Sequence, residues 1–308
     1  MAEIVISEFM DEAAIRASFG GRDVLYDPKL VDDAPRLAAA VRDARALIVR
    51  NRTQVRGALL ESAQRLEVVG RLGVGLDNID VPACEARGIA VYPATGANDL
   101  SVAEYVITAA LMLLRRAWFA SARVAAGEWP RTELMGRELA GKRLGLVGYG
   151  AIARVTGRMA RDLGMSVAAY DPLLPADHAA WAHAIRQPLT ELLKDSDVVS
   201  LHVPLTDATR NMIDARAIAT MRRGAILVNA ARGGVVDEAA LCESLRAGHL
   251  GGAGFDVSAR EPVDAAAGAL FAGVPNLILT PHIAGVTEES NVRVSAVTAE
   301  AVARHLGA

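Results

Sequence analysis

Hydrophobic residues in the first hundred positions fall into short runs separated by segments with helical periodicity. Runs rich in Val, Ile and Leu predict buried strands at residues 4–7, 46–50, 66–71 and 89–92. Apolar residues at helical spacing predict helices at residues 34–43, 53–63 and 81–87. Strands that alternate with helices are typical of parallel sheets covered by helices. We therefore expect an α/β unit at the start of the chain.

The same alternation returns in the second part of the chain. Its predicted strands lie at residues 143–147, 166–170, 198–203, 225–229, 252–257 and 277–280. Its predicted helices lie at residues 151–163, 189–194, 214–221, 237–247 and 287–305. The pattern therefore indicates two similar α/β units in tandem, each with a parallel sheet.

One long helix is predicted between the two units, over residues 101–126. Its apolar residues recur on one broad face, and the sequence around residues 109–114 is strongly helix-forming. Gly127 follows as a plausible C-terminal cap. Such a helix would separate two domains or pack a dimer.

Composition narrows the class of protein. The chain has 308 residues, which favours about two domains, and 52% of them are hydrophobic, enough for sizeable cores. The formal net charge of -3 gives no attraction to nucleic acid or to an anionic membrane. We therefore expect a globular protein that has neither of these as a partner.

No targeting, disulfide or metal signal stands out. Cys84 and Cys242 are far apart in the sequence and make no C-x-x-C motif. The first residues carry acids and no basic segment, so a signal peptide is not expected. The longest apolar stretch, residues 106–114, is too short to span a bilayer. We expect a cytoplasmic protein without a metal site.

The sharpest local motif is a glycine-rich turn between a predicted strand and a predicted helix. Gly148, Gly150 and Ala153 form the pattern Gly-x-Gly-x-x-Ala, which lets the backbone approach a dinucleotide diphosphate at the helix N-terminus. The next strand ends at Asp171, near the spacing expected for an acid that binds the adenosine ribose. This context predicts NAD rather than NADP. The glycine cluster at residues 70–75 has the wrong order for such a turn and is interpreted as a tight loop.

Three polar residues follow later strands of the second unit. Arg232, Glu261 and His282 all come shortly after predicted strands, where an open α/β sheet binds its ligands. Hydride transfer between a hydroxy acid and a keto acid needs a cation for the carboxylate, which Arg supplies. It also needs a proton carrier, and His titrates near neutral pH. A Glu beside that His would hold the ring and stabilise imidazolium.

Taken together, these motifs resemble those of the D-isomer-specific 2-hydroxyacid dehydrogenase family over essentially the whole length of the chain. The matching segments are residues 73–80, 101–104, 148–153, 202–206, 229–237, 255–262 and 280–285. The resemblance implies His282 as general acid and base, Glu261 as its partner and Arg232 as the anchor of the substrate carboxylate. One departure is Ala153 in place of the third glycine, which the motif tolerates.

The resemblance also implies ligand contacts and domain boundaries. The NAD contacts it implies are Gly148, Gly150, Ala151, Ile152, Asp171, Pro204, Ala230, Ala231, Arg232, Asp256 and His282. The substrate contacts it implies are Val74, Gly75, Asn98 and Arg232. It further implies a discontinuous substrate domain, residues 1–98 and 286–308, with an NAD-binding domain, residues 99–285, inserted in it. Both domains are expected to be Rossmann-like or flavodoxin-like, in a homodimer formed through the long helix.

The segments at residues 4–12 and 48–53 resemble those of bacterial (S)-sulfolactate dehydrogenases, which oxidise that acid to sulfopyruvate. A dianionic substrate needs cations beyond Arg232, and Arg50, Arg52 and Arg71 lie at predicted strand ends of the first unit. Solvated loop arginines are the alternative interpretation.

Two other functions stay open at this point. A short D-3-phosphoglycerate dehydrogenase would carry the same segment at residues 71–80. An NAD(H)-sensing binding protein of this fold would retain much of the same site, and only turnover of a hydroxy acid would distinguish it from an enzyme.

Overall fold

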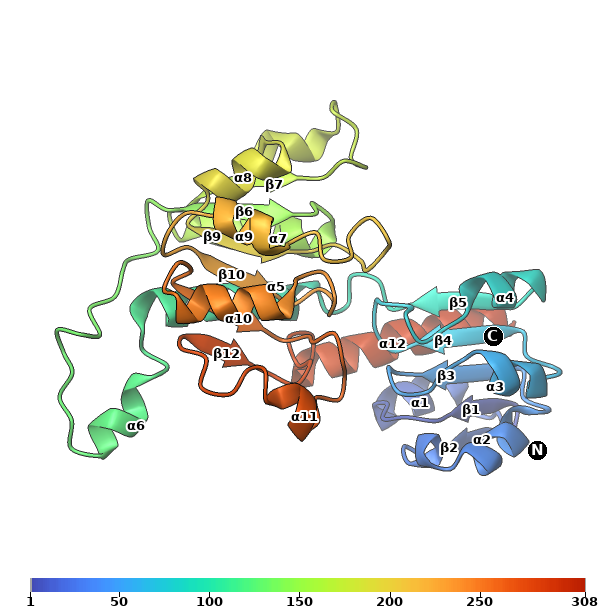
Figure 1. Ribbon diagram of the computed structural model, residues 1–308. Helices are drawn as coiled ribbons and strands as arrows, with labels where there is room; N and C mark the ends of the chain where they lie inside the picture. Colours follow the sequence, from blue (N-terminus) through green and yellow to red (C-terminus); the bar gives the residue numbers. More distant parts are fainter. Residues whose placement is uncertain (1, 308) are drawn as a thin grey trace. The chain divides into compact units, whose positions relative to one another are not determined.

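The computed structural model describes residues 2–307, and the chain divides into two compact units. One unit is made of Met1–Asn98 together with Val286–Ala308, and the other of Asp99–Gly285. The first unit is therefore built from two separate stretches of the chain (Figure 1).

In the first unit, five strands form a parallel sheet in the order β2-β1-β3-β4-β5. The strands are β1 (Ile4–Ile6), β2 (Val24–Tyr26), β3 (Ala46–Val49), β4 (Val68–Arg71) and β5 (Ala90–Pro93). The helices are α1 (Glu12–Phe19), η1 (Leu30–Asp32), α2 (Ala34–Val41), α3 (Gly57–Ser62), α4 (Val81–Ala86) and α12 (Glu288–His305). Helices α1 and α12 pack on one face of the sheet, and α2, α3 and α4 contribute to the core on the other.

In the second unit, seven strands form a parallel sheet in the order β12-β11-β10-β9-β6-β7-β8. The strands are β6 (Arg143–Val147), β7 (Ser166–Tyr170), β8 (Ile185–Arg186), β9 (Val198–Leu201), β10 (Ile226–Asn229), β11 (Gly252–Phe255) and β12 (Leu277–Leu279). The helices are α5 (Asp99–Arg115), α6 (Ala120–Ala125), α7 (Ala151–Asp162), η2 (Ala179–His183), α8 (Leu189–Asp195), α9 (Ala215–Thr220), α10 (Glu238–Arg246) and α11 (Ala265–Gly268). Helices α5 and α7 cover one face, and α8, α9 and α10 the other.

The predicted α/β class is confirmed, and most predicted strands differ from the observed ones by one or two residues. Their apolar runs are buried on both faces, as parallel sheets require. Aspartates begin many of the helices: Asp33, for example, accepts the backbone N–H of Arg36 at 3.0 Å. Six elements were not predicted, namely α1, η1, β2, η2, β8 and α11, and none of them is longer than eight residues.

The single helix predicted over residues 101–126 is wrong. Helix α5 ends at Arg115, and α6 begins only at Ala120. Arg116 adopts a left-handed conformation with φ 53°, and two backbone hydrogen bonds close the helix end, from Arg116 N to Leu113 O and from Ala117 N to Met112 O. This pair of bonds is the Schellman motif, which normally has glycine at the left-handed position. An arginine there gives no sequence signal for a helix end.

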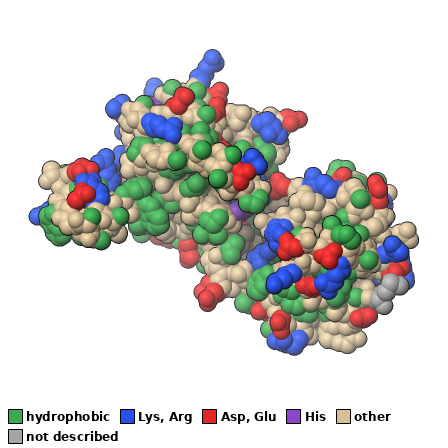
Figure 2. Space-filling view, turned by 60° about the horizontal axis from the view of Figure 1, so that its bottom comes forward, with side chains coloured by type: hydrophobic (Ala, Val, Ile, Leu, Met, Phe, Trp, Pro, Cys, Tyr) green, Lys and Arg blue, Asp and Glu red, His purple; other side chains and the backbone are tan. Residues whose placement is uncertain are grey.

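The face of the protein shown in Figure 2 carries acidic and basic side chains intermixed over its surface.

Within residues 2–307, no helix is both long and apolar enough to cross a membrane. No group of three or more His, Cys, Asp or Glu side chains in that range is arranged to hold a metal ion.

Candidate active site

His282 and Glu261 form a close pair in the second unit. His282 lies in the loop after β12, and Glu261 lies in the loop after β11. The His282 Nδ1 atom is 2.7 Å from Glu261 Oε2. This contact leaves Nε2 of the ring for another partner. An imidazole held by a carboxylate in this way can take up and return a proton.

The backbone of His282 is fixed by a buried carboxylate. His282 has a left-handed φ of 58°, and its N–H donates to the Asp256 carbonyl oxygen at 2.8 Å. The Asp256 carboxylate, 1% exposed, accepts the N–H groups of Ile283 at 2.8 Å and Ala284 at 2.7 Å. Asp256 therefore holds the loop that carries the histidine. A contact between Asp256 and NAD stays a prediction.

A chain of hydroxyl groups continues from Asp256 to helix α5. The Thr280 hydroxyl donates to Asp256 Oδ1 at 2.6 Å, so its oxygen is available to accept from the Tyr105 hydroxyl, 2.6 Å away. Burial raises the pKa of Tyr105 to about 12. Tyr105 thus stays protonated and donates. No sequence signal pointed to these hydrogen bonds, because a tyrosine on a helix and a threonine after a strand are both common.

Glu261 is kept ionised by its neighbours. Burial raises its pKa, but the hydrogen bonds from His282 and from the Ser258 N–H (2.9 Å), together with the charges of His282 and Arg232, lower it overall. A carboxylate that remains charged at neutral pH stabilises the imidazolium formed when His282 takes a proton.

Arg232 is positioned by the loop after β10. The Asn229 side chain accepts the Ala231 N–H at 3.1 Å and donates to the Arg232 carbonyl at 3.0 Å. Gly233 follows, and a Cβ at this position would lie 1.9 Å from the Ser258 carbonyl oxygen. Only glycine allows the two loops this approach. The structure therefore brings the Arg232 segment next to the segment that leads to Glu261.

The glycine-rich turn between β6 and α7 fits a dinucleotide. Gly148 has φ 87°, and a Cβ there would lie 2.6 Å from the His202 carbonyl oxygen. Gly150 caps α7 without a side-chain hydrogen bond, and a Cβ on it would meet no protein atom within 4 Å. The first turn of α7 thus offers backbone N–H groups to an anion, as the diphosphate of NAD requires.

Asp171 lies at the end of β7, and its carboxylate binds the same turn. It accepts the Tyr149 N–H at 2.9 Å through Oδ2, and the N–H groups of Leu173 at 2.9 Å and Leu174 at 3.2 Å through Oδ1. Asp171 therefore caps the following turn, and each of its carboxylate oxygens can still accept a hydrogen bond from a ribose hydroxyl. The ribose contact stays a prediction.

The other predicted NAD contacts share one edge of the second sheet. Each comes shortly after a strand of this parallel sheet, at its carboxyl end, where such folds bind nucleotides. Ala151 and Ile152 open α7; Pro204 follows β9; Ala230 and Ala231 follow β10. Ala231 is nearly buried at 9% exposure, so its backbone is the part available to a ligand.

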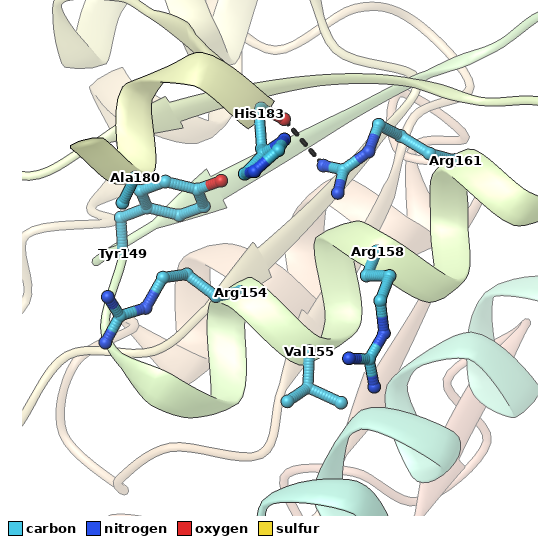
Figure 3. A pocket seen from close by; sticks show the side chains of 7 residues that line it. All are labelled: Tyr149, Arg154, Val155, Arg158, Arg161, Ala180 and His183. Atoms are coloured by element: carbon cyan, nitrogen blue, oxygen red, sulfur yellow. Dashed lines mark hydrogen bonds between the residues drawn. The ribbon is translucent and has the colours of Figure 1, made fainter.

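A separate cavity of about 310 Å³ lies beside α7 and is shown in Figure 3. It is lined by Tyr149, Arg154, Val155, Arg158, Arg161, Ala180 and His183. Arg161 donates to the His183 carbonyl oxygen at 2.6 Å. The guanidinium groups of the three arginines point in different directions in Figure 3, so they do not converge on one ligand atom. His282 and Glu261 do not line this cavity.

In the first unit, the three predicted arginines have different surroundings. Arg50 lies half-buried after β3, and its guanidinium lies 5.8 Å from the centre of the Phe9 ring. Arg52 forms an ion pair with Asp32. Arg71 donates to the carbonyl oxygens of Leu72 at 2.7 Å and Gly75 at 2.8 Å. Arg71 thus holds the loop at residues 72–75 through hydrogen bonds to its backbone carbonyl groups.

That loop holds the predicted carboxylate-binding backbone. Val74 and Gly75 are both half-buried within it. Gly73 has φ 150°, and a Cβ there would lie 2.2 Å from the Arg71 guanidinium. Asn98 is the last residue of the first stretch, and its Oδ1 atom accepts no hydrogen bond from the described chain. Binding of substrate by these residues stays a prediction.

Comparison with known proteins identifies the class of protein. The D-isomer specific 2-hydroxyacid dehydrogenase NAD binding domain model matches residues 107–284. The (S)-sulfolactate dehydrogenase of Chromohalobacter salexigens is 55% identical over 308 residues, covering 100% of this chain and 99% of that protein. The D-3-phosphoglycerate dehydrogenase of Methanocaldococcus jannaschii is 36% identical over 99% of this chain, which spans 58% of that protein.

A solved structure agrees with this result. The D-lactate dehydrogenase of Aquifex aeolicus, determined with NAD and lactic acid, has a TM-score of 0.86 and 28% identity, covering 97% of this chain and 94% of that one. The match extends over both units, and its bound NAD agrees with the glycine-rich turn described above. The chain belongs to the D-isomer specific 2-hydroxyacid dehydrogenase family and is an NAD-dependent oxidoreductase that interconverts a 2-hydroxy acid and its 2-keto acid.

Proposed function

We propose that this enzyme oxidises (S)-sulfolactate to sulfopyruvate. The observation that carries the proposal is the 55% identity to the (S)-sulfolactate dehydrogenase of Chromohalobacter salexigens over the whole chain. The half-buried Arg50 of the first unit supports it, because a tetrahedral sulfonate pairs well with a guanidinium. The stereochemistry agrees: the sulfonate-bearing carbon takes priority in naming, so S-sulfolactate has the spatial arrangement of a D-hydroxy acid.

We assign the proton transfer to His282. When bound, NAD accepts the hydride that leaves C2 of the hydroxy acid. The C2 hydroxyl proton passes to Nε2 of His282, since Nδ1 is held by Glu261 at 2.7 Å. Glu261 remains ionised and stabilises the imidazolium that results. In the reverse direction, the same imidazolium returns the proton to the alkoxide oxygen.

We assign the substrate carboxylate to Arg232, with the backbone N–H groups of Val74 and Gly75 as further donors. The planar guanidinium offers parallel N–H groups to a carboxylate. Asn229 holds the backbone of this loop through the Ala231 N–H and the Arg232 carbonyl, and the guanidinium itself donates to the Ala231 carbonyl at 2.6 Å. Arg232 would thus orient the substrate so that the hydrogen on C2 faces NAD and the hydroxyl group on C2 faces His282.

A substrate panel tests the proposal. NADH formation is measured with (S)-sulfolactate, 3-phosphoglycerate, glycerate and D-lactate at several concentrations of each. We expect kcat/KM to be highest for sulfolactate. A value for sulfolactate no higher than that for lactate would remove the sulfonate assignment.

D-3-phosphoglycerate is the second candidate substrate. The D-3-phosphoglycerate dehydrogenases of Methanocaldococcus jannaschii and Archaeoglobus fulgidus are 36% and 39% identical to this chain. Both candidates carry an anionic group on C3 in addition to the carboxylate. The same panel separates them, since sulfonate and phosphate differ in charge at neutral pH.

We also propose a cytoplasmic homodimer. The segment at residues 116–138 exposes large apolar side chains, with Trp129 79% and Met135 72% exposed, and Figure 2 shows apolar surface on it at the left of the view. Arg123 braces the segment by pairing with Glu128 and Glu133. Trp129→Ser should shift the protein towards monomer in sedimentation velocity. An unchanged dimer, or a monomeric parent protein, would contradict this.

The two buried free cysteines suit a reducing compartment such as the proposed cytoplasm.

A further inference from the structure

A buried carboxylate organises the loop that carries Arg50. Glu8 follows strand β1 and is only 4% exposed. Its Oε1 atom accepts the N–H groups of Arg50 at 2.9 Å and Thr53 at 3.0 Å, and its Oε2 atom accepts the Arg52 N–H at 3.1 Å. A buried charge is costly unless such donors surround it. The three hydrogen bonds therefore tie the loop at residues 50–53 to the carboxylate.

The carbonyl side of the same loop is held by a second buried side chain. Asn78, 5% exposed, donates through Nδ2 to the Thr53 carbonyl at 2.7 Å and to the Arg50 carbonyl at 3.2 Å. The hydroxyl groups of Ser7 and Thr53 lie 2.9 Å apart and complete the contacts. Both the N–H groups and the carbonyl groups of the loop are thus fixed, which leaves Arg50 with a preset backbone.

The Arg50 guanidinium is bound only by neutral groups in the described chain. It donates to Asn291 Oδ1 on α12, and to the Phe9 carbonyl at 3.5 Å. Of its five N–H groups, these bonds use two. Arg52, in contrast, is paired with Asp32. Arg50 is therefore the arginine of this loop with donors available for an added oxyanion.

Glu8 also compensates the burial of that cation. Burial lowers the pKa of Arg50, and the charge of Glu8 opposes this effect. The Glu8 carboxylate binds the loop backbone rather than the guanidinium, so it supplies negative charge without occupying the N–H groups that an oxyanion would use.

We propose that Glu8 is a positioning residue that presents Arg50 to the anionic group on C3 of the substrate, and so determines the preference for a hydroxy acid with an anionic group on C3. This inference rests on the proposed function, because it assigns a partner to the sulfonate or phosphate group. It also predicts that Arg50, rather than Arg52 or Arg71, carries the discrimination.

The test is a double-mutant cycle on the full-length enzyme. Arg50→Ala, Glu8→Gln, the double variant and the parent are compared with (S)-sulfolactate, 3-phosphoglycerate and D-lactate in the presence of NAD. The quantity is the ratio of kcat/KM for each acid that has an anionic group on C3 to that for lactate. We expect Glu8→Gln and Arg50→Ala each to lower this ratio about tenfold or more, mainly through KM. In the Arg50→Ala background, Glu8→Gln should change it less than about twofold.

Controls separate positioning from folding. Glu67→Gln removes a carboxylate of the same unit that pairs with Arg45, away from this loop, and should leave the ratio unchanged. Arg52→Ala should lower the ratio much less than Arg50→Ala. Thermal unfolding is recorded for each variant, and if Glu8→Gln does not fold, Asn78→Ser is used in the same cycle because it releases the other side of the loop.

The outcomes distinguish the two proposals. If Arg50→Ala lowers the ratio but Glu8→Gln does not, or if their effects multiply, the role of Glu8 is refuted while the substrate assignment stands. If phosphoglycerate is preferred over sulfolactate, it replaces sulfolactate as the proposed substrate, and the double-mutant cycle is then evaluated with phosphoglycerate. If neither sulfolactate nor phosphoglycerate is preferred over lactate, both proposals fail.

Discussion

At the scale of single residues, the loop after β12 shows how one buried carboxylate can place a reactive side chain. His282 has a left-handed backbone, which costs free energy for a residue with a Cβ. Asp256 offsets this cost by accepting hydrogen bonds from Thr280, Ile283 and Ala284 around it. The result is a fixed backbone at His282, and the imidazole itself is held by Glu261 at 2.7 Å, an arrangement that suits proton transfer.

The proposed acid and base role of His282 gives the first prediction. His282→Ala should lower kcat by about 10²–10⁴ because the proton carrier is lost. The dissociation constant of NAD, measured by fluorescence titration, should change by less than about threefold, since we propose that the diphosphate binds at the turn of Gly148 and Gly150. His305→Ala, on the last turn of α12, is the matched control and should keep the parent rate. A variant at 282 with near-normal kcat would refute the assignment.

His202 gives a prediction on pH and stability. Its Nε2 atom lies 2.9 Å from the Ser200 hydroxyl, and burial lowers the pKa of His202 to about 4. An unfolded histidine has a pKa of about 6.5, so below that pH the unfolded chain binds the proton first. Stability should therefore fall as the pH drops from about 6.5 to about 4, by up to about 3 kcal/mol, and then level off with respect to this group.

Urea unfolding of the parent and of His202→Asn checks this at a series of pH values. The difference between the two free energies of unfolding should change within that pH window and be constant above it. Parallel curves across the window would show that burial does not perturb this histidine.

At the scale of elements, the end of α5 depends on an unusual residue. Arg116 occupies the left-handed position of a Schellman motif, where glycine has no steric cost. Its side chain donates to the exposed Glu133 carbonyl at 3.1 Å, a contact that contributes little. The backbone rather than the side chain of Arg116 therefore ends the helix.

The prediction at this scale concerns two adjacent arginines. Arg116→Gly should raise the free energy of unfolding by about 0.5–1 kcal/mol, because glycine relieves the left-handed strain. Arg115→Gly, one residue earlier, should lower it by a similar amount, because Arg115 is the last helical residue. Chemical denaturation measures both. If both substitutions destabilise equally, the helix continues through residue 116.

At the scale of the whole molecule, the first unit depends on both ends of the chain. Helix α12 packs on the same face of the sheet as α1, and its residues Val294, Ala299 and Val302 belong to that core. Strand β4 approaches the helix closely: a Cβ on Gly70 would lie 2.8 Å from methyl groups of both Thr298 and Val302. The absence of a side chain at Gly70 thus allows the C-terminal helix to dock.

Gly70→Ala is therefore expected to destabilise the protein by about 1–3 kcal/mol through overpacking. Thr298→Ser removes one of the two methyl groups and should recover part of the loss in the double variant. Thermal unfolding of the three variants measures this. An additive or larger loss in the double variant would contradict close contact between β4 and α12.

The sequence alone determined the class of fold, the cofactor and the enzyme family. Parallel strands buried on both faces have continuous apolar runs, and these are visible without coordinates. The glycine-rich turn and Asp171 are local in sequence, so their spacing was sufficient to predict NAD. The Arg116 break was missed because the left-handed position normally filled by glycine carries an arginine.

Only the tertiary structure decided how the polar residues are shared between structural support and chemistry. Glu8, Asn78, Asp256 and Tyr105 lie far in sequence from the groups they bind, and nothing in their local sequence predicts these contacts. Folding buries them, and a buried polar group must find a partner. That requirement, which acts through space rather than along the chain, fixed the loops that carry His282 and Arg50.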